Sequence, residues 1–532
     1  MVLKKWQLSG AASVVALLAA GSAQAQTVSA EQIDKLQNQI QTLQRELQAM
    51  KKKVDAAPEK AYAAPAPVLK APPGPPPSAV AQMSAGNRPS ICTPDLQNCI
   101  AFTSRLHLDY GGYSYSPNTS STNPQHLDSG INARRARIGV LGTFAGDWQY
   151  ALIYDFGGSA DGFAGSVGSN NGTTTTLLPG GGTSGIQTAL VGYAGIRPLG
   201  GQLVIEAGYQ DVPWTLDEAT SSNDIMFIER ASSVNIATNI AAGDFRSSAG
   251  FRWFDKNLWV SAYATGPVSG SIHTGNVQTE QFGAVARVAW QIYQDKDYSF
   301  HIGGNYENLF KPVTARTNLA GVAVAPNAFQ SLTLSDRPEL RIDPTVIVTT
   351  TIPLVSNAQV LGVEGAAQLG PLFVQGEYFH YDINRKNGTG LPDLHFDGGY
   401  AEAGWVITGE KRPYNQAAGA YGGIVPANPF SSKGGWGAIE LAGRWSVVDL
   451  NDKLGVNNLP IPGLGSTQFG ANGGRQTIYT AGLNWYATRN VMFKLNYLHG
   501  DINKLSSTVA TPAPTNAGAK FDAVALRTQV AF

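Results

Sequence analysis

The sequence contains little charge, few cysteines and, after its N-terminus, no long apolar run. Charged residues make up 14% of its 532 residues, against about 25% in an average soluble protein. Its 2 cysteines are too few for a disulfide-dense secreted module. No run of about 18 apolar residues follows the N-terminal segment, which excludes bilayer-spanning helices there. Basic and acidic residues balance at 38 each, so no nucleic-acid partner is indicated.

The N-terminal segment has the pattern of a secretory signal. Lys4 and Lys5 precede an apolar run over residues 11–20, and Ala23-Gln24-Ala25 then supplies small residues at a cleavage site. The pattern predicts a signal peptide over residues 1–25 and export from the cytoplasm. A retained membrane anchor is the alternative, and the shortness of the apolar run argues against it.

Residues 26–55 carry apolar residues at alternating spacings of three and four. This 3.5-residue period places one narrow apolar stripe along a helix, which a second copy or a partner can cover. We therefore predict a short coiled coil; an amphipathic helix lying on a surface is the alternative. The stripe consists of Ile33, Leu36, Ile40, Leu43, Leu47, Met50 and Val54.

Residues 56–100 are predicted to form a proline-rich linker that ends in a cysteine pair. Pro72-Pro73 and Pro75-Pro76-Pro77 favour an extended polyproline spacer. Cys92 and Cys99 follow, and in an oxidising compartment a local disulfide is the expected state. Free or metal-bound thiols are the alternatives.

From residue 101 to residue 532 the sequence alternates apolar and polar residues over stretches of about ten, each followed by turn residues. In 202–210, Leu203, Ile205 and Tyr209 share one face, whereas Glu206 and Gln210 share the other. A period of two indicates half-buried β-strands.

The apolar face could point to the core of a soluble sandwich or to lipid. Short and long connections alternate along the chain, and aromatic residues stand at strand ends, as in outer-membrane barrels. Both features favour a barrel. The strand-end aromatic residues are Trp148, Tyr209, Tyr378, Trp405, Trp445 and Trp485.

The alternation predicts a sixteen-stranded antiparallel transmembrane β-barrel. An even count returns the C-terminus to the side of the N-terminus, and residues 340–353 are assigned to a long loop because a strand there would break this parity. The predicted strands are 102–115, 132–144, 148–157, 187–197, 202–210, 246–254, 257–265, 280–293, 297–308, 358–369, 372–383, 397–409, 434–448, 475–487, 490–501 and 520–532.

Several segments occur in the order found in one porin family. The chain ends in an alternating strand, 524–532, with a terminal Phe532. Residues 211–214 and 220–230 are similar to the third-loop segment of the phosphate-selective porin O and P family. Further matching stretches are 369–371 with 376–378, 408–410 with 412–414, and 437–446. The sequence thus resembles this family over nearly its whole length.

The resemblance implies a trimeric outer-membrane channel with loops folded into each lumen and a periplasmic N-terminus, in a Gram-negative bacterium. Its expected partners are outer-membrane lipid and small hydrophilic solutes or ions, with phosphate among the candidate anions. A barrel of this strand number is wide enough for an aqueous lumen. An envelope-tethering scaffold or adhesin anchored by the coiled coil is the alternative function.

Ion preference would depend on charged side chains that face the lumen. In the cluster 134–137, Ile138 faces lipid, which places Arg135 and Arg137 inside. Arginine suits anion binding because its guanidinium donates in a planar fork; for any one arginine, a salt bridge within the wall is the alternative. The pore candidates are Arg135, Arg137, Asp224, Glu229, Arg230, Arg246, Arg252, Arg287, Arg337, Arg341 and Arg444.

Carboxylates oppose these arginines on the inward face. Mixed charge of this kind favours weak net selectivity over strict phosphate specificity. The inward carboxylates are Asp155, Glu206, Glu307, Glu364, Glu377, Glu402 and Glu440.

The sequence indicates no enzyme, cofactor or metal centre. It has no GxSxG nucleophile elbow, and its seven histidines include no HExxH spacing. His107, His301 and His380 lie on strands far apart in the sequence, so we expect no metal site from them.

Overall fold

The structure is a computed structural model that describes residues 41–42, 45, 80–83, 87–116, 126–157, 185–241, 246–268, 277–312, 314–315, 318–319, 322–323, 331–454, 459–461, 465–467, 469–504 and 519–532. The chain divides into two units, residues 1–76 and 77–532, and the second is described below. The predicted signal peptide, most of the predicted coiled coil and the proline-rich stretch before residue 80 lie outside the described residues. Of the coiled-coil segment, Gln41, Thr42 and Arg45 are helical.

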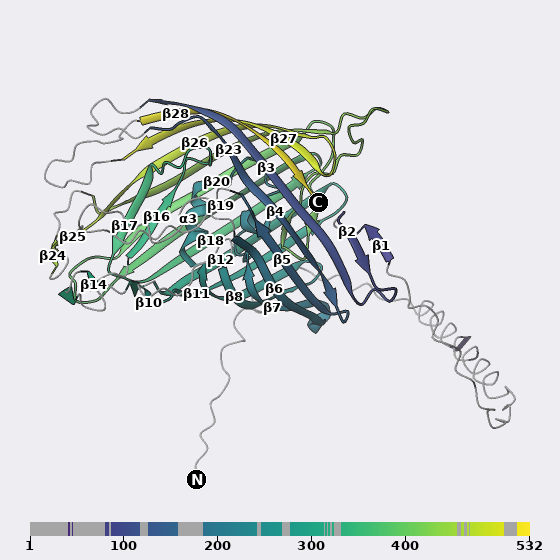
Figure 1. The fold of residues 1–532 in the computed structure, drawn as a ribbon, viewed down its shortest axis with the longest axis horizontal. Helices are drawn as coiled ribbons and strands as arrows, with labels where there is room; N and C mark the ends of the chain where they lie inside the picture. Colours follow the sequence, from purple (N-terminus) through teal and green to yellow (C-terminus); the bar gives the residue numbers. More distant parts are fainter. Residues whose placement is uncertain are drawn as a thin grey trace, which may run out of the picture. The chain divides into compact units, whose positions relative to one another are not determined.

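Sixteen strands of the second unit pair antiparallel with a neighbour on each side and close into a barrel (Figure 1). The last strand pairs with the first, from Lys520 opposite Ser116 to Ala531 opposite Arg105. In order they are β3 (Cys99–Ser116), β4 (Gly130–Phe144), β5 (Trp148–Asp155), β6 (Gly185–Ile196), β7 (Gln202–Gln210), β8 (Arg246–Phe254), β9 (Leu258–Val268), β11 (Phe282–Gln294), β12 (Tyr298–Lys311), β18 (Val355–Leu369), β19 (Leu372–Arg385), β20 (Leu394–Val406), β23 (Ala438–Asp452), β26 (Ala471–Tyr486), β27 (Val491–Asn503) and β28 (Ala519–Ala531).

The predicted strand count is confirmed, and each predicted strand overlaps one barrel strand. Tight connections separate strands at one end. At two of these turns, Gly146 and Gly370 adopt φ of 76° and 60°, backbone conformations that side chains other than glycine rarely allow. These short turns fix the antiparallel register of the strands they join.

The exposure of side chains on the strands is the reverse of that in a soluble protein. Arg287 and Glu440 are 1% and 0% exposed, whereas Ile205 is 48% exposed. Leucines form a row across four neighbouring strands on the exposed face, with Trp485 and Phe493 stacked on the side of the short turns. The row consists of Leu441, Leu483, Leu495 and Leu526. The apolar face therefore points outward, as a lipid-facing wall requires.

Two short strands precede the barrel in the segment that we predicted to be linker. β1 (Val80–Met83) pairs with β2 (Pro89–Cys92), and β2 pairs with the start of β3. The linker prediction is therefore wrong for these residues, because Ser90 and Cys92 bury their side chains in a β pattern. Cys92 and Cys99 face each other in this sheet and are joined by a disulfide.

Three chain segments pack against the inner face of the barrel. The β7–β8 connection contains α2 (Leu216–Ala219) and α3 (Ser232–Ala241). The β12–β18 connection contains β16 (Ser331–Asp336) and β17 (Val348–Pro353), which pair with each other outside the barrel sheet. Residues 340–353, predicted to be loop, thus include a strand, yet the barrel parity is kept. The third segment is the long β20–β23 connection at the end of the short turns.

The remaining elements are small. They are the 3-10 helix η1 (Pro198–Gly200) and the pairs β10 (Val277–Thr279) with β13 (Thr314–Ala315), β14 (Asn318–Leu319) with β15 (Val322–Ala323), β21 (Tyr414–Asn415) with β22 (Ala420–Tyr421), and β24 (Leu459–Ile461) with β25 (Gly465–Thr467). No helix among the described residues is long and apolar enough to cross a membrane.

We expect Leu483→Arg to impair folding into lipid vesicles, because Leu483 lies in the middle of the leucine row. An arginine that faces lipid is destabilising, by about 2–4 kcal/mol at the bilayer midplane and by less toward the interfaces, which is measurable as a lower urea midpoint of folding. The matched control is Leu199→Arg, since Leu199 is 93% exposed at a turn. Equal midpoints for both variants would contradict a lipid-facing position for Leu483.

Candidate functional site

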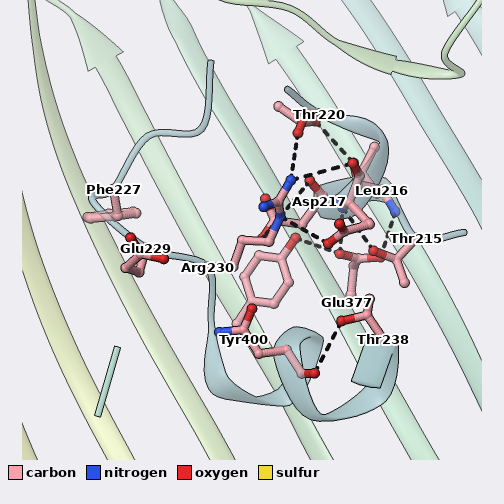
Figure 2. A network of polar contacts seen from close by, with 12 residues as sticks. Thr215, Leu216, Asp217, Thr220, Phe227, Glu229, Arg230, Thr238, Glu377 and Tyr400 are labelled. Atoms are coloured by element: carbon pink, nitrogen blue, oxygen red, sulfur yellow. Dashed lines mark hydrogen bonds and ion pairs between the residues drawn. The ribbon is translucent and has the colours of Figure 1, made fainter. Parts of the chain in front are cut away.

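The β7–β8 connection is anchored to the barrel wall where α2 begins. Thr215 caps the helix by accepting a hydrogen bond from the Glu218 backbone N–H at 3.0 Å. The Glu377 carboxylate of β19 accepts the backbone N–H groups of Leu216 and Asp217 at 2.8 and 3.0 Å, and Tyr400 donates to it at 2.9 Å. These bonds satisfy orphan donors of the helix N-terminus, so the wall holds the loop at this point (Figure 2).

Arg230 folds back onto the same helix (Figure 2). Its guanidinium donates to the Thr220 carbonyl at 2.9 Å and to the Asp217 carbonyl at 3.2 Å, and it lies 3.3 Å from the Glu218 carboxylate. Arg230 was predicted as a pore cation, but its donors are used within the loop. It closes the turn between α2 and α3, residues 220–231, which we call the constriction segment.

Glu229 joins the constriction segment to the opposite wall. Its carboxylate accepts two hydrogen bonds from Arg134, at 2.8 and 3.0 Å, and one from Arg527, at 2.8 Å. Burial alone would raise the pKa of Glu229, but the cations of Arg134, Arg135 and Arg527 hold this pKa well below its usual range. The carboxylate therefore remains charged over the whole physiological pH range.

A β-bulge explains why two consecutive arginines point inward. The register between β3 and β4 shifts between His107 and Leu108, so that His107 faces Arg135 and Leu108 faces Ala133. A bulge adds one residue without a partner across the ladder. Arg134 therefore joins Arg135 on the inner face, and both are almost fully buried.

Arg135 differs from the other inward arginines in its bonding. Its Nη1 lies 3.8 Å from Glu229, beyond hydrogen-bond distance, and within the described part of the chain Nε and Nη1 have no hydrogen-bond partner. Beside it, His107 Nε2 contacts the Asn223 side chain at 3.0 Å, whereas no described residue is a hydrogen-bond partner of His107 Nδ1. Unused polar atoms thus gather where the constriction segment faces β3 and β4.

Four other predicted arginines pair with carboxylates on the inner face. Arg137 pairs with Asp155 at 2.7 Å, a salt bridge within the wall, and Arg287 pairs with Glu364 at 2.8 Å. The Arg252 pair with Glu206, at 3.4 Å, is looser. Arg444 contacts Glu339 at 2.6 Å and donates to the Glu229 carbonyl at 2.9 Å.

The other predicted cations contact loops. Arg246 donates to the Asn239 carbonyl at 2.8 Å, and Arg337 donates to the Pro344 carbonyl at 3.3 Å. Arg341 pairs with Asp336 at 3.0 Å and lies 3.9 Å from Glu229. The structure thus brings Arg135, Glu229, Arg341 and Arg444 together, whereas Arg246 and Arg337 bond elsewhere.

The long β20–β23 connection meets the constriction segment from the other end of the barrel. Arg412 donates to the Asp224 carbonyl at 2.6 Å and to both Glu440 carboxylate oxygens at 2.9 Å. Arg287 of β11 donates to the Gly419 carbonyl at 2.7 Å. Asp224, a predicted pore residue, therefore lies where the two inserted segments touch.

Several inward cations of the described residues escaped the sequence analysis, among them Arg105, Arg134, Arg412, Lys494 and Arg527. Lys494 and Arg527 alternate with the lipid-facing Leu495 and Leu526, so strand parity could have found them. No comparable sequence pattern predicts the other inward positions. Arg134 points inward because of a bulge, and the position of Arg412 depends on how the β20–β23 connection folds.

We expect Glu229→Gln to loosen the constriction segment, because it leaves buried arginines without their carboxylate. Breaking a buried ion pair costs about 3–5 kcal/mol, so amide hydrogen exchange in residues 220–231 should accelerate by more than about a hundredfold while the barrel strands stay protected. Glu410→Gln is the control, since Glu410 forms no ion pair among the described residues. Unchanged exchange in Glu229→Gln would contradict the anchoring role.

Known proteins similar to this chain include porins. A profile of the family described as "Phosphate-selective porin O and P" matches residues 100–532. Porin O of Pseudomonas aeruginosa is 22% identical over 441 residues, covering 78% of this chain and 86% of Porin O.

Two solved structures are also similar to the chain. OmpT, an outer membrane protein of Vibrio cholerae, has a TM-score of 0.42 and 12% identity, covering 81% of this chain and 98% of OmpT. The anion-selective porin from Comamonas acidovorans has a TM-score of 0.40 and 11% identity, covering 81% and 99%. Because the family profile spans the entire barrel, this chain belongs to the phosphate-selective porin O and P family and forms an outer-membrane channel.

Proposed function

We propose that this porin passes small hydrophilic solutes and inorganic ions, phosphate among them, with modest rather than strict ion preference. The observation that carries the proposal is the pairing of inward cations with carboxylates or carbonyls, as for Arg137, Arg287 and Arg444. A paired cation contributes little net field to a permeating ion, whereas a filter needs charge that the solute can reach. The family implies a channel rather than an enzyme.

Arg135 is the inward cation to which we assign the attraction of permeating anions. It is almost fully buried beside the constriction segment, so it acts through its charge and not by direct contact. Among the described residues, its Nε and Nη1 carry no hydrogen bond. A positive charge without a hydrogen-bonded carboxylate contributes more field to the lumen than a paired charge does. The carboxylates of Glu229 and Asp109, which bind Arg134 and Arg527, lie close by. Their negative charge limits the attraction of anions.

The assembly and orientation belong to the same proposal. We infer a homotrimer in the outer membrane of a Gram-negative bacterium, exported by the signal peptide of residues 1–25. The short turns and the long β20–β23 connection face the periplasm, where the coiled coil of residues 26–55 also lies, and the other long connections face outward. General barrel architecture, with short periplasmic and long external connections, supports this orientation.

The ion preference is tested by reversal potentials of the protein in planar bilayers under a potassium chloride gradient. We expect Arg135→Gln to move the reversal potential toward cation preference, because the substitution removes a positive charge beside the constriction segment. Repeating the measurement with potassium phosphate tests whether phosphate responds to the same charge. A strong, phosphate-blockable anion preference in the natural protein would overturn modest selectivity.

Two controls separate the charge of Arg135 from general damage to the lumen. Arg135→Lys keeps the positive charge and should keep most of the ion preference. The double variant Arg137→Gln with Asp155→Asn neutralises a wall pair and should leave the reversal potential unchanged. If Arg135→Gln behaves like this double variant, Arg135 does not face the ion path.

The ion preference should also depend on pH through Asp224. Burial raises the pKa of Asp224 above its ordinary 3.8, against the attraction of Arg412, Arg105 and Lys494. A raised carboxyl pKa means that the proton binds at a higher pH, so acidification removes this negative charge early. Anion preference should therefore grow as the pH falls from 7 to about 4.

The comparison of variants identifies the titrating group. Asp224→Asn should show more anion preference at neutral pH and a flatter pH profile than the natural protein. Part of the slope should remain, because burial also raises the pKa of Asp217. Glu229→Gln should keep the slope, since the Glu229 carboxylate stays charged throughout. Identical slopes in the natural protein and Asp224→Asn would exclude Asp224 as the group.

A further inference from the structure

Two hairpins of the barrel share a sequence pattern that the channel does not use. Residues 378–385 read YFHYDINR and residues 497–504 read YLHGDINK. On the partner strands, residues 395–397 read HFD and residues 520–522 read KFD. The two hairpins therefore agree in histidine, aspartate and tyrosine positions and differ where His395 corresponds to Lys520.

The strand register brings the first set of side chains together on the outer face. His380 lies opposite Asp397, and Asp382 lies opposite His395, across β19 and β20. All four are at least partly exposed, next to Tyr378 on the side of the long connections. They stand on the outer wall, away from the lumen that the previous sections describe.

Two imidazoles converge on one carboxylate oxygen. His395 Nδ1 lies 2.6 Å from Asp382 Oδ1, and His380 Nε2 lies 3.3 Å from the same oxygen. The two rings are nearly parallel, at 7°, with centroids 6.1 Å apart. One ligand atom from each of the three residues lies within 4.8 Å of the others. Around a tetrahedral zinc ion such atoms are about 3.4 Å apart, so small side-chain movements suffice.

Asp397 supplies an independent sign of a metal site. Its carboxylate contacts His380 Nδ1 at 2.8 Å and also accepts a hydrogen bond from the Tyr378 hydroxyl. A histidine that binds a metal through one ring nitrogen commonly donates its other N–H to a carboxylate, which fixes the tautomer and ring orientation. Asp397 thus leaves His380 Nε2 free to face Asp382 and His395.

We propose that His380, Asp382 and His395 bind a divalent transition metal of the zinc class, with Asp397 as the positioning residue. Imidazole and carboxylate ligands suit zinc, copper and nickel rather than calcium or magnesium. Three protein ligands leave a coordination position open to water. The bound ion joins β19 to β20 at the outer edge of the barrel wall.

The second hairpin shows the same arrangement with a built-in cation. His499 contacts Asp522 at 2.9 Å, and Tyr497 donates to Asp522 at 2.6 Å. The Lys520 ammonium lies 3.4 Å from Asp501, the carboxylate that corresponds to Asp382. Lysine cannot ligate a metal while it is protonated. The Lys520 ammonium puts a positive charge beside Asp501, where a metal ion would lie beside Asp382 in the first hairpin. This hairpin is therefore the natural control.

The test is zinc binding to the purified full-length porin in detergent, measured by equilibrium dialysis with elemental analysis. We expect one zinc ion per chain, and cobalt substitution should give the visible absorption of a low-coordinate site. His395→Lys, which copies the second hairpin, should abolish this binding. Asp397→Asn should weaken it about 10- to 100-fold.

The reciprocal variant keeps the proposal falsifiable. Lys520→His should create a second site and raise the stoichiometry to two zinc ions per chain, while His499→Ala should leave the natural stoichiometry at one. Heat-modifiable mobility on gels verifies that each variant is folded. Equal zinc binding by the natural protein and His395→Lys, or no binding by either, overturns the proposal.

Discussion

The constraint on which the structure depends is that hydrocarbon cannot accept or donate hydrogen bonds. A strand in lipid must find partners for all its backbone groups, and only closure supplies them at the first and last strands. β28 therefore pairs with β3 along its length. Successive side chains of a strand point to opposite faces of the closed sheet. When the apolar side chains face lipid, the charged side chains must face the lumen. The low overall charge of the sequence and the dense charge of the lumen have this single cause.

Closure also creates an interior too wide to be selective by itself, and the inserted segments use the wall charges as anchors. Glu229 and Glu339 come from inserted segments and bind wall arginines, Arg134 and Arg444. Each buried charge needs its partner, because an uncompensated one is costly. Most wall cations are thus committed to holding loops. Because most inward charges are paired, few of them remain to attract a solute. Arg135 differs, since its Nε and Nη1 have no hydrogen-bond partner among the described residues.

The strands and their inward faces could be predicted because both follow from a two-residue period, which is local. In 202–210 the predicted bounds agree with β7. The site could be predicted only in part. Arg137 follows strand parity, but Arg134 points inward because of a bulge, and Arg230 bonds within its own loop. Arg412 depends on a long connection whose path the sequence pattern does not encode. The pair His380 and His395 follows no metal-binding sequence spacing, because the register of β19 and β20 brings the two side chains together.

The outer hairpins differ physically from the lumen. Beneath the inserted segments, most charges are buried away from water and are paired. At the exposed edge of β19 and β20 water could solvate each imidazole and carboxylate alone, so folding does not require His380 and His395 to converge on Asp382. The β27–β28 hairpin repeats the tyrosine, histidine and aspartate positions and places an ammonium beside Asp501. Both hairpins therefore place a positive charge beside the corresponding carboxylate. Lys520 supplies this charge beside Asp501, and a metal ion held by the two imidazoles supplies it beside Asp382.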